Sequence, residues 1–211
     1  MSRTVFRVAA VMLAAALVAA PHAILRAQGG QATPTPDPKP RPDLVRQPFN
    51  QADVAFIAGM IPHHAQAVIM AGWAPSHGAR ADVKILCEKI VVAQRDEITF
   101  MRNWLRDRGQ EVPDATSTKH KMKMDGMEHD MLMPGMLTDE EMAALDKARG
   151  PEFDRLFLIG MIKHHQGAIT MVNDLFAANG SMQDDDVYKF ASDVFADQST
   201  EIERMQQMLN K

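Results

Sequence analysis

Methionine and histidine are the residue types in this sequence that could bind a metal ion. The chain has 211 residues, including 17 Met, 8 His and one Cys. Thioether sulfur is a soft ligand that favours Cu(I), or its mimic Ag(I), over zinc, iron or magnesium, and neutral imidazole also binds copper. Because Cys87 is the single cysteine, an intrachain disulfide and a cysteine-based zinc or iron–sulfur site are excluded.

Two short motifs each occur twice along the chain. The stretch Met60-Ile61-Pro62-His63-His64 recurs as Met161-Ile162-Lys163-His164-His165, and Gln-x-x-Glu-Ile-x-x-Met occurs at 94–101 and again at 198–205. Such a repeat indicates two helical hairpins of one ancestry, which would bring both copies to one core. We predict a metal site in that core, with these candidate ligands: His63, His64, His164, His165, Met60, Met161, Met101 and Met205.

Four polar residues lie on otherwise apolar helical stripes. Gln94 and Glu97 interrupt one stripe, and Gln198 and Glu201 interrupt the corresponding stripe of the second repeat. In both stripes successive positions are alternately four and three residues apart. A buried polar group without a partner costs about 1–3 kcal/mol. We therefore expect these residues to accept imidazole N–H bonds and so to orient the histidine rings, without binding the metal themselves. The two glutamates could equally be direct ligands, and a hydrogen-bond network without metal is the alternative.

Methionines also gather between the two repeats, in the segment 118–137. Eight candidate ligands lie there among charged residues, glycine and proline: His120, Met122, Met124, Met127, His129, Met131, Met133 and Met136. Because polar residues separate the methionines, we expect no apolar face and no core packing for this segment. It is predicted to be a flexible loop that wraps a small soft ion.

Start and stop signals predict helices in the rest of the chain. The expected ranges are about 50–73, 79–108, 138–150, 151–178 and 185–210. Asn50 is a helix cap, Thr138 and Glu141 form a capping box, and Pro151 suits a first helical turn. The predicted fold is all-α, an antiparallel four-helix bundle formed by two duplicated helical hairpins.

The N-terminus has the layout of a secretory signal peptide. Arg3 and Arg7 precede an apolar run that is too short to span a bilayer comfortably, so residues 1–27 are predicted to be cleaved. An uncleaved anchor is the alternative. Residues 28–48 form a proline-rich linker, and 49–211 form the bundle domain. We expect a periplasmic or secreted protein with no stable membrane insertion after cleavage.

Composition and the absence of certain motifs argue against several classes of function. Without residues 1–27 the chain has 20 basic and 27 acidic residues, and this negative excess disfavours nucleic-acid binding. No Glu-x-x-His pair occurs in the sequence, which disfavours a di-iron carboxylate bundle. The sequence has no phosphate-binding glycine loop, nucleophile elbow or other catalytic constellation, so we expect no enzyme.

The motifs resemble those of domain-of-unknown-function family 305 over about residues 50–211. The resemblance rests on both His-His motifs, both Gln-x-x-Glu-Ile-x-x-Met motifs, Met133-Pro-Gly-Met136 before Glu141-Met142, and Phe153-Asp-Arg-Leu-Phe157. It implies a ferritin-like bundle in the cell envelope, similar to CopM-like periplasmic copper-binding proteins. It further implies a part in copper resistance and no established enzymatic activity.

The residues and the resemblance together predict a periplasmic copper-binding protein, with Cu(I) favoured, for sequestration, transfer or resistance. Its partners would be the metal ion and a copper-transfer protein, and its oligomeric state stays open. Two alternatives are kept. One is a copper-dependent oxidoreductase that oxidises Cu(I) or handles peroxide. The other is a structural envelope bundle whose polar core binds no metal.

Overall fold

A computed structural model describes residues 46–124 and 127–210 of the chain. The predicted signal peptide (1–27) and nearly all of the predicted linker (28–48) lie outside the described residues. The elements follow in the order α1 (Gln51–Gly72), α2 (Ala81–Asp107), β1 (His120–Met124), β2 (Met127–Met131), α3 (Asp139–Lys147), α4 (Pro151–Ala177) and α5 (Asp185–Leu209).

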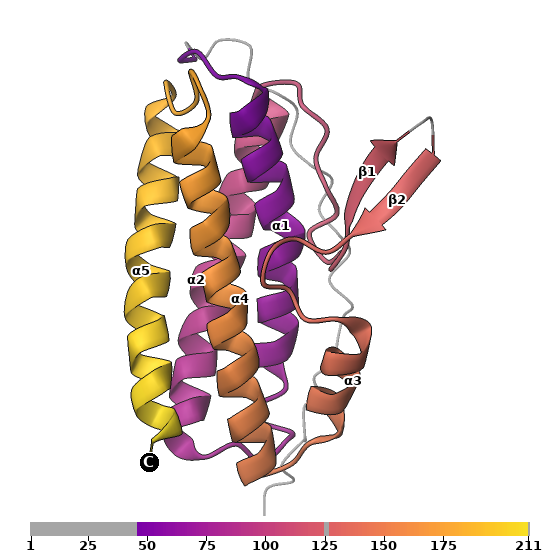
Figure 1. Cartoon of the computed structure of the whole chain (residues 1–211), viewed down its shortest axis with the longest axis vertical. Coiled ribbons are helices and arrows are strands. Elements are labelled where there is room, and N and C mark those ends of the chain that lie inside the picture. The colour runs from indigo at the N-terminus through magenta and orange to yellow at the C-terminus, as the bar shows by residue number, and fades with distance from the viewer. Residues whose placement is uncertain (1–45, 125–126, 211) are drawn as a thin grey trace, which may run out of the picture. The chain divides into compact units, whose positions relative to one another are not determined.

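Four long helices form the bundle (Figure 1). α1 packs against α2, and α4 packs against α5, each pair as an antiparallel hairpin, while α1 also packs against α4. The short α3 lies against α4 and α1. The predicted four-helix bundle is confirmed, with each helix boundary within three residues of its expected position. Among the described helices, α1 alone is long and apolar enough to cross a membrane by length and composition. However, 72% of its most apolar stretch is buried inside the bundle.

The expected caps account for the starts of two helices. Asn50 Oδ1 accepts hydrogen bonds from the backbone N–H groups of Ala52 at 2.8 Å and Asp53 at 3.1 Å. The Asp53 carboxylate in turn accepts a bond from the Asn50 N–H. Thr138 and Glu141 make the same reciprocal arrangement at α3. These bonds satisfy amide donors that a first helical turn leaves free.

The core consists of two hydrophobic clusters with polar residues between them. One cluster contains the C-terminal part of α1, the N-terminal parts of α2 and α4, and the C-terminal part of α5. The second cluster contains the opposite ends of the same four helices. Within about one turn of the change from one cluster to the other, each helix buries polar side chains. These six residues, which we call the polar layer, are His63, His64, Gln94, His164, His165 and Gln198.

The segment 118–137 differs from the flexible loop that we expected. β1 and β2 pair as an antiparallel hairpin over most of it, because the alternation of Met or His with charged residues has the period of a strand. Residues 133–137, which we call the strap, then run from the hairpin onto the bundle. The expectation of a loop is therefore wrong for the hairpin, whereas the strap is a loop that docks on the bundle.

Gln66 holds the strap through two hydrogen bonds, and two glycines allow it to pack closely on the bundle. Gln66 of α1 donates to the Leu137 carbonyl at 2.9 Å and accepts from the Leu137 N–H at 2.7 Å. Gly135 has a φ of 76°, a conformation that glycine adopts without steric penalty. A Cβ atom at Gly167 of α4 would lie 1.9 Å from the Pro134 carbonyl oxygen, so the two backbones touch there.

Replacing Gly167 by Ala should therefore lower stability by about 1–3 kcal/mol, because the added methyl group overlaps the strap backbone. The matched control is Gly72→Ala, since nothing lies within 4 Å of a Cβ at that helical position. This control should be neutral or slightly stabilising. Urea unfolding measures both effects, and hydrogen exchange at the Leu137 amide reports on the strap. Equal unfolding midpoints for the two variants would contradict the close packing.

Candidate metal centre

All four paired histidines are fully buried. His63 and His64 come from α1, and His164 and His165 come from α4, so the contact between these helices brings the two pairs together. Within each pair, one ring bonds a residue of its own helical hairpin. The other ring lies at the boundary between the two hairpins.

The outer rings, those of His64 and His165, each bond a glutamate of their own hairpin. His64 Nε2 lies 2.6 Å from Glu97 Oε2, and His165 Nε2 lies 2.6 Å from Glu201 Oε2. The two glutamate side chains are 24% and 25% exposed, so each carboxylate lies at the solvent edge of the bundle. The same bond thus occurs at equivalent positions of the two repeated motifs.

The inner rings, those of His63 and His164, face one another with their centroids 3.8 Å apart. His63 Nε2 bonds the carbonyl oxygen of Pro134 in the strap at 3.0 Å. His164 Nε2 bonds the backbone carbonyl oxygen of His63, also at 3.0 Å. The strap is therefore a direct partner of the histidine cluster, which the sequence analysis did not foresee.

The hydrogen-bond partners determine the tautomer of all four imidazoles. A carbonyl or carboxylate oxygen accepts, so each Nε2 atom must carry the proton. In a neutral ring the Nδ1 atom then has a free lone pair. All four Nδ1 atoms are buried without a hydrogen-bond partner.

Burial keeps the inner rings uncharged. It lowers the pKa of His63 to about 3, with repulsion from His64 as the next contribution. Burial, followed by repulsion from His63, also holds the pKa of His164 well below its usual range. At neutral pH both rings are therefore neutral imidazoles, the form that binds metal ions.

The unmet groups of the polar layer are all acceptors. Besides the four Nδ1 atoms, Oε1 of Gln94 and Oε1 of Gln198 are buried without a partner. Each unmet group costs about 1–3 kcal/mol in the metal-free protein. The edge of the layer is also electronegative, since burial and the nearby Glu97 carboxylate raise the pKa of Asp197.

The four bundle methionines lie on both sides of the polar layer, and all are fully buried. Met60 and Met101 belong to one hydrophobic cluster, and Met161 and Met205 belong to the other. Each is four residues, or about one helical turn, from a histidine or glutamate of the His–Glu bonds. Among the described residues, no group of three or more His, Cys, Asp and Glu side chains is set up to hold a metal ion.

The β-hairpin assigns its candidate ligands to one face. Its register pairs His120 with Met131, Met122 with His129 and Met124 with Met127, and in between it pairs Lys121 with Asp130 and Lys123 with Glu128. Opposite residues share a face, and successive residues alternate between faces. The six Met and His positions therefore belong to one face and the charged pairs to the other. Our expectation that no such face forms is wrong.

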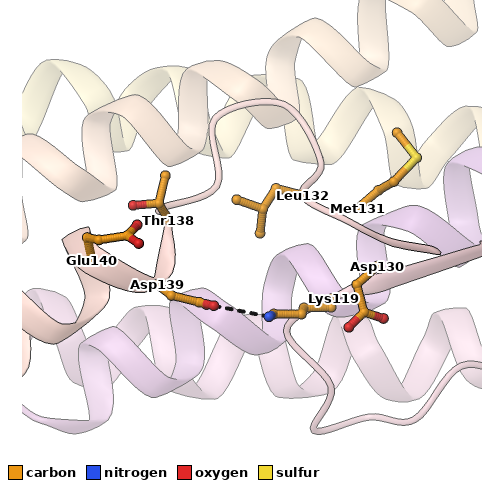
Figure 2. A pocket seen from close by; sticks show the side chains of 7 residues that line it. All are labelled: Lys119, Asp130, Met131, Leu132, Thr138, Asp139 and Glu140. Atoms are coloured by element: carbon orange, nitrogen blue, oxygen red, sulfur yellow. Dashed lines mark hydrogen bonds and ion pairs between the residues drawn. The ribbon is translucent and has the colours of Figure 1, made fainter.

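The hairpin candidates whose side chains are described are mostly open to solvent. Met127 is 62% exposed and Met131 40%, and burial of the half-buried His120 lowers its pKa. Figure 2 shows Lys119 Nζ reaching the Asp139 carboxylate at 3.1 Å, beside a pocket of about 240 Å³ between the hairpin and α3. An exposed ion pair of this kind contributes little, so the strap is the stronger link between hairpin and bundle.

The strap methionines do not belong with the exposed candidates. Met136 is buried, and its sulfur accepts a hydrogen bond from the Met133 N–H at 3.3 Å. Met133 packs against the second hydrophobic cluster. Gln66 and Gly167, on which the strap docks, were also not predicted from the sequence. Their partners lie about 70 and 33 positions away along the chain, so no local pattern pointed to them.

Comparison with known proteins gives a family and one distant curated relative. The family model described as a domain of unknown function (DUF305) matches residues 53–209. The uncharacterized protein L153 of Acanthamoeba polyphaga mimivirus is 34% identical over 56 residues. That match spans 26% of this chain and only 37% of the length of the relative.

Solved structures match most of the bundle. A DUF305 fragment from Deinococcus radiodurans has a TM-score of 0.62 and 26% identity, covering 77% of this chain and 98% of its own. A presumed secreted DUF305 protein from Streptomyces coelicolor has a TM-score of 0.62 and 27% identity, covering 75% and 92%. CopM in its Cu(I)-bound form has a TM-score of 0.56 and 29% identity, covering 75% and 95%. The chain belongs to the DUF305 family.

Proposed function

We propose that this protein binds copper, with Cu(I) favoured, at the polar layer of its bundle. The observation that carries the proposal is the set of four buried Nδ1 lone pairs without a hydrogen-bond partner. Every one of these rings is anchored through its Nε2 atom, so the lone pairs have defined positions. One cation can accept several lone pairs at once, whereas a hydrogen-bond donor satisfies one for each proton.

The surrounding methionines favour a soft ion. Met60 and Met161 lie one turn from His64 and His165 in apolar surroundings, where a strongly hydrated hard cation would be costly to place. Thioether and imidazole together suit Cu(I) and its mimic Ag(I). CopM has been solved with Cu(I), with Cu(II) and with Ag bound, which supports this choice for a relative of 29–30% identity.

Glu97 and Glu201 would act on the imidazoles rather than on the metal. A carboxylate that accepts the second N–H of a metal-binding imidazole fixes the ring orientation and raises the basicity of the ligand. Their partly exposed position at the edge of the layer also offsets the positive charge of a bound ion.

The hairpin would capture copper at the surface. Its Met and His positions share one face, and the described members Met127, His129 and Met131 are exposed. Exposed thioether ligands exchange a soft ion more readily than buried ones, so we assign the hairpin weaker sites than the polar layer.

The cellular role we propose is storage or transfer of copper in the cell envelope. The predicted signal peptide at 1–27 and the secreted character presumed for the Streptomyces coelicolor relative support this location. A copper-transfer protein would be the partner. We propose binding rather than catalysis because the four imidazoles have no exposed surface at which a second substrate could react.

Changing all four paired histidines to Gln should lower the affinity for Cu(I) by about 100-fold or more. Losing the hydrogen-bond partner of a metal-binding imidazole already costs about 10–100-fold, and losing the imidazole itself should cost at least as much. Gln keeps an N–H donor for the carbonyl partners and so preserves the fold. Anaerobic competition against a Cu(I) chelator measures the affinity. The matched control is His129→Gln on the hairpin, which should retain the tightest site. Equal affinity of the quadruple variant and the parent would contradict the proposal.

Replacing Glu97 and Glu201 together by Gln should weaken Cu(I) binding by about 10–100-fold, because the neutral amide is a poorer acceptor for imidazole N–H. The same competition titration measures this, with circular dichroism as a check that the bundle remains folded. Asp193→Asn on exposed α5 surface is the matched control for loss of negative charge. If the glutamate variants bind as tightly as that control, the carboxylates have no part in the site.

The stability of the metal-free protein should fall as the pH falls from 6.5 toward about 5. In the unfolded chain His63 and His164 regain pKa values near 6.5, whereas in the folded protein both stay unprotonated, so the unfolded state binds more protons in this range. Each ring should contribute about 1 kcal/mol per pH unit, and the loss continues toward the folded pKa of about 3 for His63.

Urea unfolding at several pH values tests this dependence. The double variant His63→Gln/His164→Gln should flatten the slope between pH 6.5 and about 5, because it removes both titrating groups. A slope that the double variant fails to alter would show that the buried rings are not held neutral.

A further inference from the structure

A second group of sulfur atoms lies where the strap crosses the groove between α1 and α4. A pocket of about 260 Å³ opens there, and the residues that give it chemical character are Met133 and Pro134 of the strap and Met171 and Asp174 of α4. The rest of its lining is apolar, from α1 and α4. In Figure 1 this is the region where the chain between β2 and α3 passes over the bundle.

The side-chain ends of two methionines lie near Gly59 of α1. A Cβ atom built at Gly59 would lie 2.7 Å from Met133 Cε and 3.5 Å from Met133 Sδ. It would also lie 3.5 Å from Met171 Cε. The missing side chain of Gly59 therefore leaves room for the methyl ends of both methionines. Met171 was assigned no role by the sequence analysis.

The pocket is connected to the histidine cluster through each of its walls. Gly59 and His63 are four residues apart and so lie on one face of α1, separated by about 6 Å along the helix axis. Pro134, which follows Met133, accepts the hydrogen bond from His63 Nε2. Met171 lies two turns from His164 on α4, with Gly167 and the strap backbone between them.

The chemistry of the pocket suits a soft monovalent cation. Two thioethers that line one pocket can bind Cu(I) or Ag(I), which tolerate few ligands, while they bind hard ions poorly. The exposed carboxylate of Asp174 at the rim adds attraction for a cation. Two thioethers alone bind less tightly than a set that includes imidazole, so an ion could leave this site for the polar layer.

We propose that Met133 and Met171 form an entry site through which Cu(I) passes to the buried histidines. This inference rests on the proposed function, because the entry site has a purpose only if the polar layer is loaded. The exposed hairpin ends at Met131, two residues before Met133, so the ligands follow one another from surface to core along the chain. The strap residue that carries the thioether is next to the one that bonds His63.

Methyl-carbon NMR of the full chain with labelled methionines tests the site directly, with Ag(I) as the probe and signals assigned through Met→Leu variants. The quadruple His→Gln variant is titrated first, so that the polar layer does not compete. The Met133 and Met171 methyl signals should shift together upon addition of Ag(I). The signal of buried Met208, at the other end of the bundle, should stay in place.

Loading kinetics test the role in entry. The double variant Met133→Leu/Met171→Leu, which keeps side-chain volume, should withdraw Cu(I) from a chromogenic chelator about tenfold more slowly than the parent. The final affinity of the polar layer should be unchanged, and the control Met208→Leu should load at the parental rate. Unfolding midpoints check that each variant is folded.

The two proposals fail in different ways. If the paired signals stay in place and the double variant loads at the parental rate, the entry site is refuted while copper binding by the polar layer stands. If the parent shifts the Met133 and Met171 signals but its imidazoles take up no ion, the proposed function of the polar layer is refuted.

Discussion

The architecture depends on four buried imidazoles that use their Nε2 protons and leave their Nδ1 lone pairs unused. Each Nε2 bond joins the layer to a different part of the molecule. Two reach glutamates at the solvent edge, one reaches the strap, and one reaches the backbone of α1. These bonds position the rings between two hydrophobic clusters. The unmet acceptors are a cost to the metal-free fold that the soft ion we propose would remove.

The strap makes the histidine cluster dependent on a segment far away in sequence. Pro134 is the acceptor for His63, and its neighbours on either side, Met133 and Gly135, touch α1 and α4. Displacing the strap would therefore take away the partner that keeps the proton on Nε2 of His63. The strap also brings the hairpin next to the bundle, so the exposed hairpin candidates and Met133 belong to one continuous stretch of chain. This continuity supports the path that we propose, from exposed hairpin ligands to the entry site at the strap.

Much of the fold and part of the site follow from local sequence rules. The Asn50 and Thr138 caps set helix starts, and the repeated motifs predict which residues meet in the core. The seam pattern also anticipates that Glu97 and Glu201 lie beside imidazoles. The hairpin was missed because the polar residues between the methionines were taken to exclude an apolar face, although a period of two separates the ligands from the charges. The choice between Nδ1 and Nε2, the docking of Gln66 on Leu137 and the meeting of Met133 with Met171 depend on contacts distant in sequence, which no local pattern encodes.

The tautomer of the buried imidazoles is the central claim, and nitrogen NMR of the histidine rings tests it most directly. In metal-free protein at neutral pH, the rings of the four paired histidines should each have a protonated Nε2 and an unprotonated Nδ1. Addition of Ag(I) should then move the Nδ1 signals of these rings while the Nε2 protons remain. Rings that carry their proton on Nδ1, or that lose the Nε2 proton when the ion binds, would contradict this account of the site.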